Sequence, residues 1–123
     1  MVRRRGPAVL LGALALAAPG CQDDSPPARP QGGTVDVVLD DFLIRPQRVR
    51  AEPGRIAFEA VNRGALGHTL RVKRGDRELV AIKSLLPGES GRGAATFERG
   101  EYKLVCVLGN HEELGMYGTL VVR

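Results

Sequence analysis

The chain of 123 residues is poor in the side chains from which most catalytic and metal sites are built. It has no tryptophan, and it contains only two histidines, two cysteines and two methionines. Met1 is the first residue, and Cys21 directly follows residues 1–20, which we expect to be a targeting segment. Four residues of these types therefore remain in the body of the chain: His68, Cys106, His111 and Met116. A Ser-His-Asp catalytic set would have to consume one of the two histidines, and a binuclear copper centre would need a further cysteine. Both kinds of site are therefore disfavoured.

The chain also lacks a strong excess of charge of one sign. The formal net charge is +4, but three of the eighteen basic residues lie at positions 3–5 in the targeting segment. From Cys21 onward the chain has fifteen basic and fourteen acidic residues, which is a net charge of +1. Nucleic-acid-binding domains usually carry a basic patch or stripe. We therefore expect no nucleic-acid partner.

Residues 1–20 have the pattern of an export signal. A basic start is followed by an apolar run at 8–18, which is too short to span a bilayer, where about 20 residues are needed. The run ends in Ala18-Pro19-Gly20-Cys21, which resembles the lipobox of bacterial lipoproteins. The resemblance implies lipid attachment at Cys21, in the periplasm or on the outer face of the cell membrane. The alternative is cleavage after Ala17 without a lipid.

The remaining chain divides into a linker and one small domain. Residues 21–33 are rich in Pro, Asp, Ser and Gly and are expected to form a flexible tether. Residues 34–123 contain short alternating apolar runs, separated by turn residues, and no amphipathic helix pattern. We predict an all-β Greek-key sandwich of about seven or eight strands. The expected extended segments are Thr34–Asp40, Phe42–Arg50, Arg55–Val61, His68–Lys73, Glu78–Leu86, Ala94–Phe97, Tyr102–Val107 and Gly118–Val122.

The most informative residues lie between the last two of these segments. Cys106, His111 and Met116 follow one another with four residues in each gap. A thiolate and a thioether are soft ligands and an imidazole is intermediate, so the set suits copper better than a hard cation. Together with His68 they make two histidines, one cysteine and a weak methionine, the ligand set of a blue-copper electron-transfer site.

Taken singly, these residues have simpler interpretations. A lone histidine on a strand is usually structural, and Cys106 and Met116 alone would be core residues. Zinc is the alternative metal, but methionine is foreign to structural zinc sites. The combination of all four residues favours one mononuclear copper ion. It also explains why an exported domain keeps a single unpaired thiol.

The order of these features resembles that of bacterial cupredoxins, the blue or type 1 copper proteins, from about Thr34 to the C-terminus. The segments that carry the resemblance are Asn62–His68, Leu86–Gly88, Gly100–Tyr102, Cys106–Met116 and Gly118–Leu120. The resemblance implies a cupredoxin-like sandwich, in which His68, Cys106 and His111 are trigonal ligands and Met116 is the axial ligand.

Neighbours of the ligands differ from the usual cupredoxin pattern, and one of them is Asn110, where the family commonly has glycine or proline. Thr69 stands where the family often has asparagine, and its hydroxyl is expected to brace the cysteine loop by hydrogen bonding. Glu112 and Glu113 directly follow His111. Two carboxylates beside this imidazole should favour the oxidised centre, so we expect a lower reduction potential than in relatives with apolar residues there.

These observations predict a copper protein that carries single electrons between extracytoplasmic redox partners near the membrane, and not an enzyme. We expect a monomer that touches the membrane only through a lipid at Cys21. The first alternative is a periplasmic copper-binding or trafficking module without electron transfer. A third interpretation is a metal-free sandwich that serves as an interaction lipoprotein.

Overall fold

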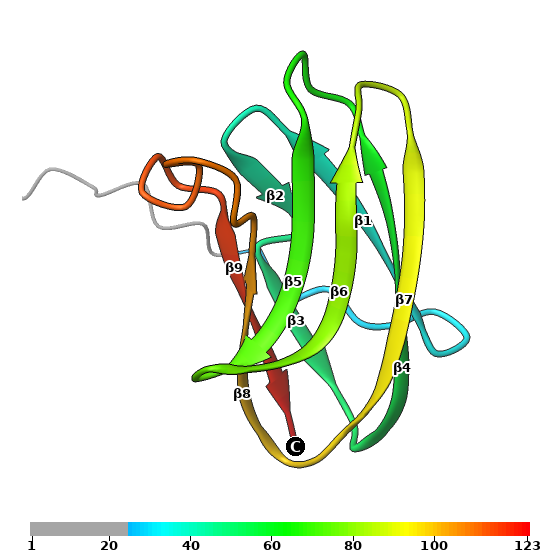
Figure 1. Cartoon of the computed structure of the whole chain (residues 1–123). Coiled ribbons are helices and arrows are strands. Elements are labelled where there is room, and N and C mark those ends of the chain that lie inside the picture. The colour runs from blue at the N-terminus through cyan, green and yellow to red at the C-terminus, as the bar shows by residue number, and fades with distance from the viewer. Residues whose placement is uncertain (1–24) are drawn as a thin grey trace, which may run out of the picture.

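The computed structural model describes residues 25–123, and the predicted export signal and Cys21 lie outside these residues. The described part forms nine strands and no helix (Figure 1). It therefore contains no helix that could cross a membrane. The strands are β1 (Thr34–Asp40), β2 (Leu43–Arg45), β3 (Arg48–Ala51), β4 (Gly54–Asn62), β5 (His68–Arg74), β6 (Arg77–Leu85), β7 (Ser90–Phe97), β8 (Gly100–Val105) and β9 (Tyr117–Val122).

The strands form two sheets packed as a sandwich. One sheet has the order β2-β1-β4-β7 and the other has the order β3-β9-β8-β5-β6. The β1–β4 and β3–β9 pairs are parallel, and the other pairs are antiparallel. The predicted all-β sandwich is confirmed, with nine strands in the described residues where about seven or eight were expected.

The additional strand comes from residues 42–50, which were predicted as one extended segment. This segment divides into β2 and β3, which belong to different sheets. Pro46 lies between them and has no amide proton to give to a sheet ladder. Phe42, just before β2, has a φ of 61°, which turns the chain back from β1 to pair with it.

The core lies between the sheets and follows the alternation of the strands. In β1, Val35, Val37 and Leu39 are buried while the residues between them are exposed or half-buried. The core residues include Phe58 and Phe97 from one sheet and Leu70, Leu104 and Leu120 from the other, and each of these is at most 1% exposed. Apolar burial from both sheets is thus the main stabilising contribution.

The glycine-rich stretch 87–93 lay between the predicted extended segments Glu78–Leu86 and Ala94–Phe97, but its second half belongs to a strand. Strand β7 begins at Ser90. A Cβ on Gly91 would lie 2.7 Å from Ile82, and one on Gly93 would lie 2.6 Å from Val80. These glycines therefore allow β7 to approach the side chains of β6, in the other sheet, closely.

Part of the segment expected to be a flexible tether lies against the domain. Ala28 forms an isolated parallel bridge with Val49 in β3. Its amide donates to the Arg48 carbonyl at 3.0 Å, and its carbonyl accepts from the Arg50 amide at 2.9 Å. Backbone pairing holds this part of the segment along β3.

Three connections meet at one end of the sandwich. Strand β5 is antiparallel to both β6 and β8, and His68 is paired with Leu85. The start of β5 therefore lies beside the ends of β6 and β8. The loops at 63–67, 86–89 and 106–116 gather there. In Figure 1 the last of these is the orange-to-red connection between β8 and β9.

Candidate metal centre

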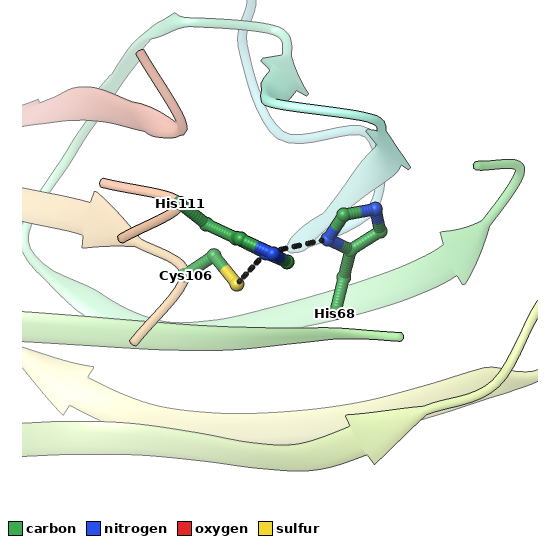
Figure 2. Close-up of side chains that lie close together, drawn as sticks. All are labelled: His68, Cys106 and His111. Carbon is green, nitrogen blue, oxygen red and sulfur yellow. Dashed lines mark hydrogen bonds between the residues drawn. The ribbon is translucent and has the colours of Figure 1, made fainter. Parts of the chain in front are cut away.

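Three of the four predicted ligands meet at this end of the sandwich. His68 is the first residue of β5, Cys106 directly follows β8, and His111 lies in the loop between β8 and β9. The Nδ1 atoms of the two histidines are 3.3 Å apart, and the Cys106 Sγ is 3.6 Å from the His111 Nδ1. Figure 2 shows that the three side chains point toward one another. All three ligand atoms lie within 4.8 Å of each other.

The two separations that involve the His111 Nδ1 fit a single small metal ion. Imidazole nitrogens bind a divalent metal such as zinc at about 2.0–2.1 Å and thiolate sulfur binds at about 2.3 Å. Two nitrogens on one ion, at an angle of about 110°, are then about 3.4 Å apart, and a nitrogen and a sulfur are about 3.6 Å apart. The observed distances of 3.3 and 3.6 Å agree with these values.

The Cys106 thiol is fully buried and is held by Thr69. The Thr69 amide donates to the sulfur at 3.4 Å, and its hydroxyl lies 3.7 Å from the sulfur. The same hydroxyl accepts from the Val107 amide at 3.1 Å. Thr69 thus connects β5 to the start of the 106–116 loop, as predicted, because a hydroxyl can accept and donate at once.

Backbone hydrogen bonds set the shape of the 106–116 loop. The Met116 amide donates to the His111 carbonyl at 3.0 Å, and the Met116 carbonyl accepts from the Cys106 amide at 3.1 Å. The His111 amide also donates to the Leu108 carbonyl at 3.0 Å. The loop is therefore folded back on itself. It brings the backbone of Met116 beside the backbones of Cys106 and His111.

The exposures of the ligands differ. His68, Cys106 and Met116 are all 0% exposed, whereas His111 is half-buried. Met116 is thus an internal residue at the base of the loop. The Phe42 and His111 rings pack edge to face, with centroids 5.2 Å apart and planes at 82°. His111 is the one residue of the four that reaches the surface.

Comparison with solved structures identifies the fold of the chain. Two auracyanins superpose with a TM-score of 0.68 each. One, from Roseiflexus castenholzii, is 17% identical and is aligned over 74% of this chain and 97% of its own. The other, auracyanin B, is 20% identical and is aligned over 81% of this chain and 92% of its own. An azurin from Methylomonas sp. strain J gives a TM-score of 0.67 at 12% identity and is aligned over 76% of this chain and 99% of its own. The chain has the cupredoxin fold. No protein-family model and no curated protein sequence matches it at a significant level.

Within this cupredoxin fold, Asp41 supports the site and was missed by sequence reasoning. Its Oδ1 lies 2.9 Å from the His68 Nε2, and its carboxylate accepts from the Ala65 and Leu66 amides at 3.0 and 3.2 Å. The Ala65 amide above all, and then His68, lower the pKa of the Asp41 carboxyl. The only sequence signal was a pair of acidic residues at the end of the first predicted strand.

Asn62 is a second supporting residue that the sequence did not reveal. It is fully buried at the end of β4. Its amide group donates to the carbonyls of Leu66 and Leu85 at 2.7 and 2.8 Å, and its side-chain oxygen accepts from the Gly64 amide at 2.9 Å. Asn62 thereby fastens the 63–67 loop to the end of β6. This loop leads directly into His68.

The charge beside His111 differs in part from the expectation. Glu112 forms an ion pair with Lys103, and both side chains are partly exposed. Lys103 also lies over the Tyr117 ring, 5.6 Å from its centroid. The positive charge of Lys103 offsets that of Glu112, so the net negative charge next to His111 is closer to that of Glu113 alone.

Proposed function

We propose that this protein is a type 1 copper protein that carries single electrons between extracytoplasmic redox partners. The observation that supports the proposal most strongly is the convergence of two imidazole nitrogens and one thiol sulfur within 4.8 Å of one another, with both separations from the His111 Nδ1 suited to a single ion. The cupredoxin fold agrees with it. A copper ion bound there would supply a reversible one-electron couple.

In this proposal His68, Cys106 and His111 would hold the ion, and the Met116 thioether would be a weak fourth ligand. Cys106 would bind as the thiolate, and its burial and the Thr69 amide keep its sulfur in a fixed place. The five-stranded sheet holds β5 and β8 side by side. Ligands fixed in this way move little when the charge of the centre changes, which favours fast electron transfer.

His111 is the proposed point where the electron enters and leaves. It is half-buried, whereas the other three proposed ligands are fully buried. Large apolar side chains are exposed on the three loops at this end: Leu66, Leu86 and Leu114 are 45%, 60% and 52% exposed. Such residues around the His111 ring would allow a partner to approach it without displacing tightly bound water.

Voltammetry of the copper-loaded protein distinguishes this function from copper trafficking or storage. An electron carrier should show an intensely coloured oxidised form and a reversible one-electron wave, because both copper states share one coordination site. A protein that binds only copper(I), remains colourless and shows no reversible wave would be a trafficking or storage module. A purified domain that takes up no copper would support the metal-free interpretation.

The location is a further part of the proposal. We propose that the protein is exported and held at the outer face of the cell membrane by a lipid on Cys21, with its redox partners near the membrane. Mass spectrometry of the mature N-terminus tests this directly. A lipid-modified Cys21 is the expected result. A chain that begins at Ala18 without a lipid would mean that the protein is a freely diffusing periplasmic carrier.

A further inference from the structure

The carboxylate of Asp41, directly after β1, contacts both the 63–67 loop and the His68 ring. Its oxygens accept hydrogen bonds from the backbone amides of Ala65 and Leu66, in the loop that leads to β5. The Oδ1 atom also lies 2.9 Å from the His68 Nε2. The imidazole is 0% exposed, whereas the carboxylate is 34% exposed. The partly exposed Asp41 carboxylate thus contacts the Nε2 side of the buried His68 ring.

This contact determines which ring nitrogen of His68 carries the proton. An ionised carboxylate can only accept a hydrogen bond, so the His68 Nε2 must donate. In the neutral imidazole the other nitrogen, Nδ1, then has a free lone pair. Nδ1 is the atom that faces the His111 Nδ1 at 3.3 Å. The ring is therefore held with its metal-binding nitrogen directed into the centre before any ion arrives.

We propose that Asp41 is a positioning residue that fixes the tautomer and orientation of His68 for copper binding. The inference rests on the proposed function, and it identifies a residue outside the four proposed ligands. Histidines that bind metals commonly donate their second nitrogen to a carboxylate or a carbonyl, and losing that partner typically weakens metal binding by about 10–100-fold. The negative charge of Asp41 at the far side of the ring should also favour the oxidised centre.

Gly64 gives independent support, because it leaves room for the Asp41–His68 contact. A Cβ at this position would lie 2.3 Å from the Asp41 Oδ1 and 2.8 Å from the His68 Nε2. Any other residue would push these atoms apart. At Gly67, in the same loop, a Cβ would meet nothing closer than 3.5 Å. The loop thus requires glycine at position 64, where the carboxylate meets the ring.

The test uses three variants of the mature protein and two matched controls. Asp41→Ala removes the acceptor, Asp41→Asn keeps an acceptor without the charge, and Gly64→Ala separates the two groups without changing either. Asp40→Asn removes the adjacent charge, whose carboxylate pairs with Arg45, and Gly67→Ala adds a methyl group without a clash. Copper(II) affinity is measured by competition with a chelator. The tautomer is read from the ¹⁵N shifts of the His68 ring in the apoprotein.

We expect the wild-type apoprotein to carry its proton on the His68 Nε2. Asp41→Ala and Gly64→Ala should lose this preference and bind copper about 10–100-fold more weakly. Asp41→Asn should keep the tautomer and raise the reduction potential more than Asp40→Asn does. If Asp41 only ties down the 63–67 loop, the variants will be less stable, but the tautomer and the affinity of the folded protein will not change. That result would overturn the proposal.

The outcome is informative even where one variant or the proposed function fails. If Asp41→Ala does not fold, the Asp41→Asn variant tests the proposal instead. A reduction potential of Asp41→Asn equal to that of Asp40→Asn would reject the role of Asp41. If the wild-type protein binds no copper, the proposed function fails. The ¹⁵N measurement on the apoprotein still tests the tautomer in that case, and a proton on Nδ1 would reject the positioning role by itself.

Discussion

Replacing Thr69 by valine should weaken the link between β5 and the 106–116 loop while leaving the shape of the side chain almost unchanged. Thr69 is 2% exposed, its hydroxyl accepts from the Val107 amide at 3.1 Å, and it lies 3.7 Å from the Cys106 sulfur. A typical hydrogen bond contributes about 0.5–1.5 kcal/mol net. Valine can make neither the bond to the Val107 amide nor the longer, weaker one to the sulfur. We therefore expect the variant to be less stable by about 1–2 kcal/mol.

This loss has a measurable size in two assays. In a domain of this size about 1 kcal/mol lowers the Tm by about 4–8 °C, so the apoprotein should melt about 4–16 °C lower. The hydroxyl also donates toward the sulfur, which is more electron-rich in the reduced centre. If that state loses about 0.5 kcal/mol more than the oxidised one, the reduction potential falls by about 20 mV.

The matched control is Thr119→Val, which makes the same chemical change at a half-buried position in β9. Calorimetry of the apoprotein and voltammetry of the copper form should separate the two variants. If Thr69→Val melts no lower than Thr119→Val and its potential does not fall, the hydroxyl does not support the thiolate in the way we describe.

Three further predictions concern residues around the same centre. The pKa of Asp41 is lowered in the folded state, chiefly by the Ala65 amide, so the unfolded chain binds this proton more readily. The resulting contribution to stability is present above about pH 4 and is lost as the pH falls through the folded-state pKa. In acid unfolding monitored by circular dichroism, the stability of Asp41→Asn should therefore fall less with decreasing pH than that of the wild type. Met116→Leu nearly conserves volume and should cost less than about 1.5 kcal/mol. The substitution removes the thioether sulfur, a weak donor to the oxidised ion, so voltammetry should give a higher reduction potential. An unchanged potential would argue against Met116 as a ligand. A Glu112→Gln, Glu113→Gln double variant should also have a raised potential. Because both side chains are partly exposed, added salt should shrink this shift, and a potential equal to that of the wild type at low salt would remove the idea that these carboxylates lower it.

The sequence predicted the fold class and the spacing of the candidate ligands because both depend on local patterns. Alternating apolar residues identify strands without any knowledge of their partners. Cys106, His111 and Met116 lie in one loop, so their proximity follows from the chain itself. His68 was linked to them by its rarity in the sequence and by the resemblance to cupredoxins, and the structure brings its ring to the other two ligand residues.

The supporting residues could not be predicted, because their contacts depend on how the strands are arranged. Asp41 reaches His68 across 27 positions only because β1 runs parallel to β4. Asn62 has to bond Leu85 across the two sheets. Gly91 and Gly93 resembled turn residues, but they are needed where β7 and β6 approach closely. Local patterns carry no information about such approaches.

The most direct test of the account is the visible absorption spectrum recorded while copper(II) is added to the reduced apoprotein. If His68, Cys106 and His111 bind one ion, an intense copper–thiolate band should appear at about 600 nm and saturate at one copper per chain. The Cys106→Ser variant should show no such band. A wild-type protein that remains colourless, or a band that persists in Cys106→Ser, would contradict the proposed centre.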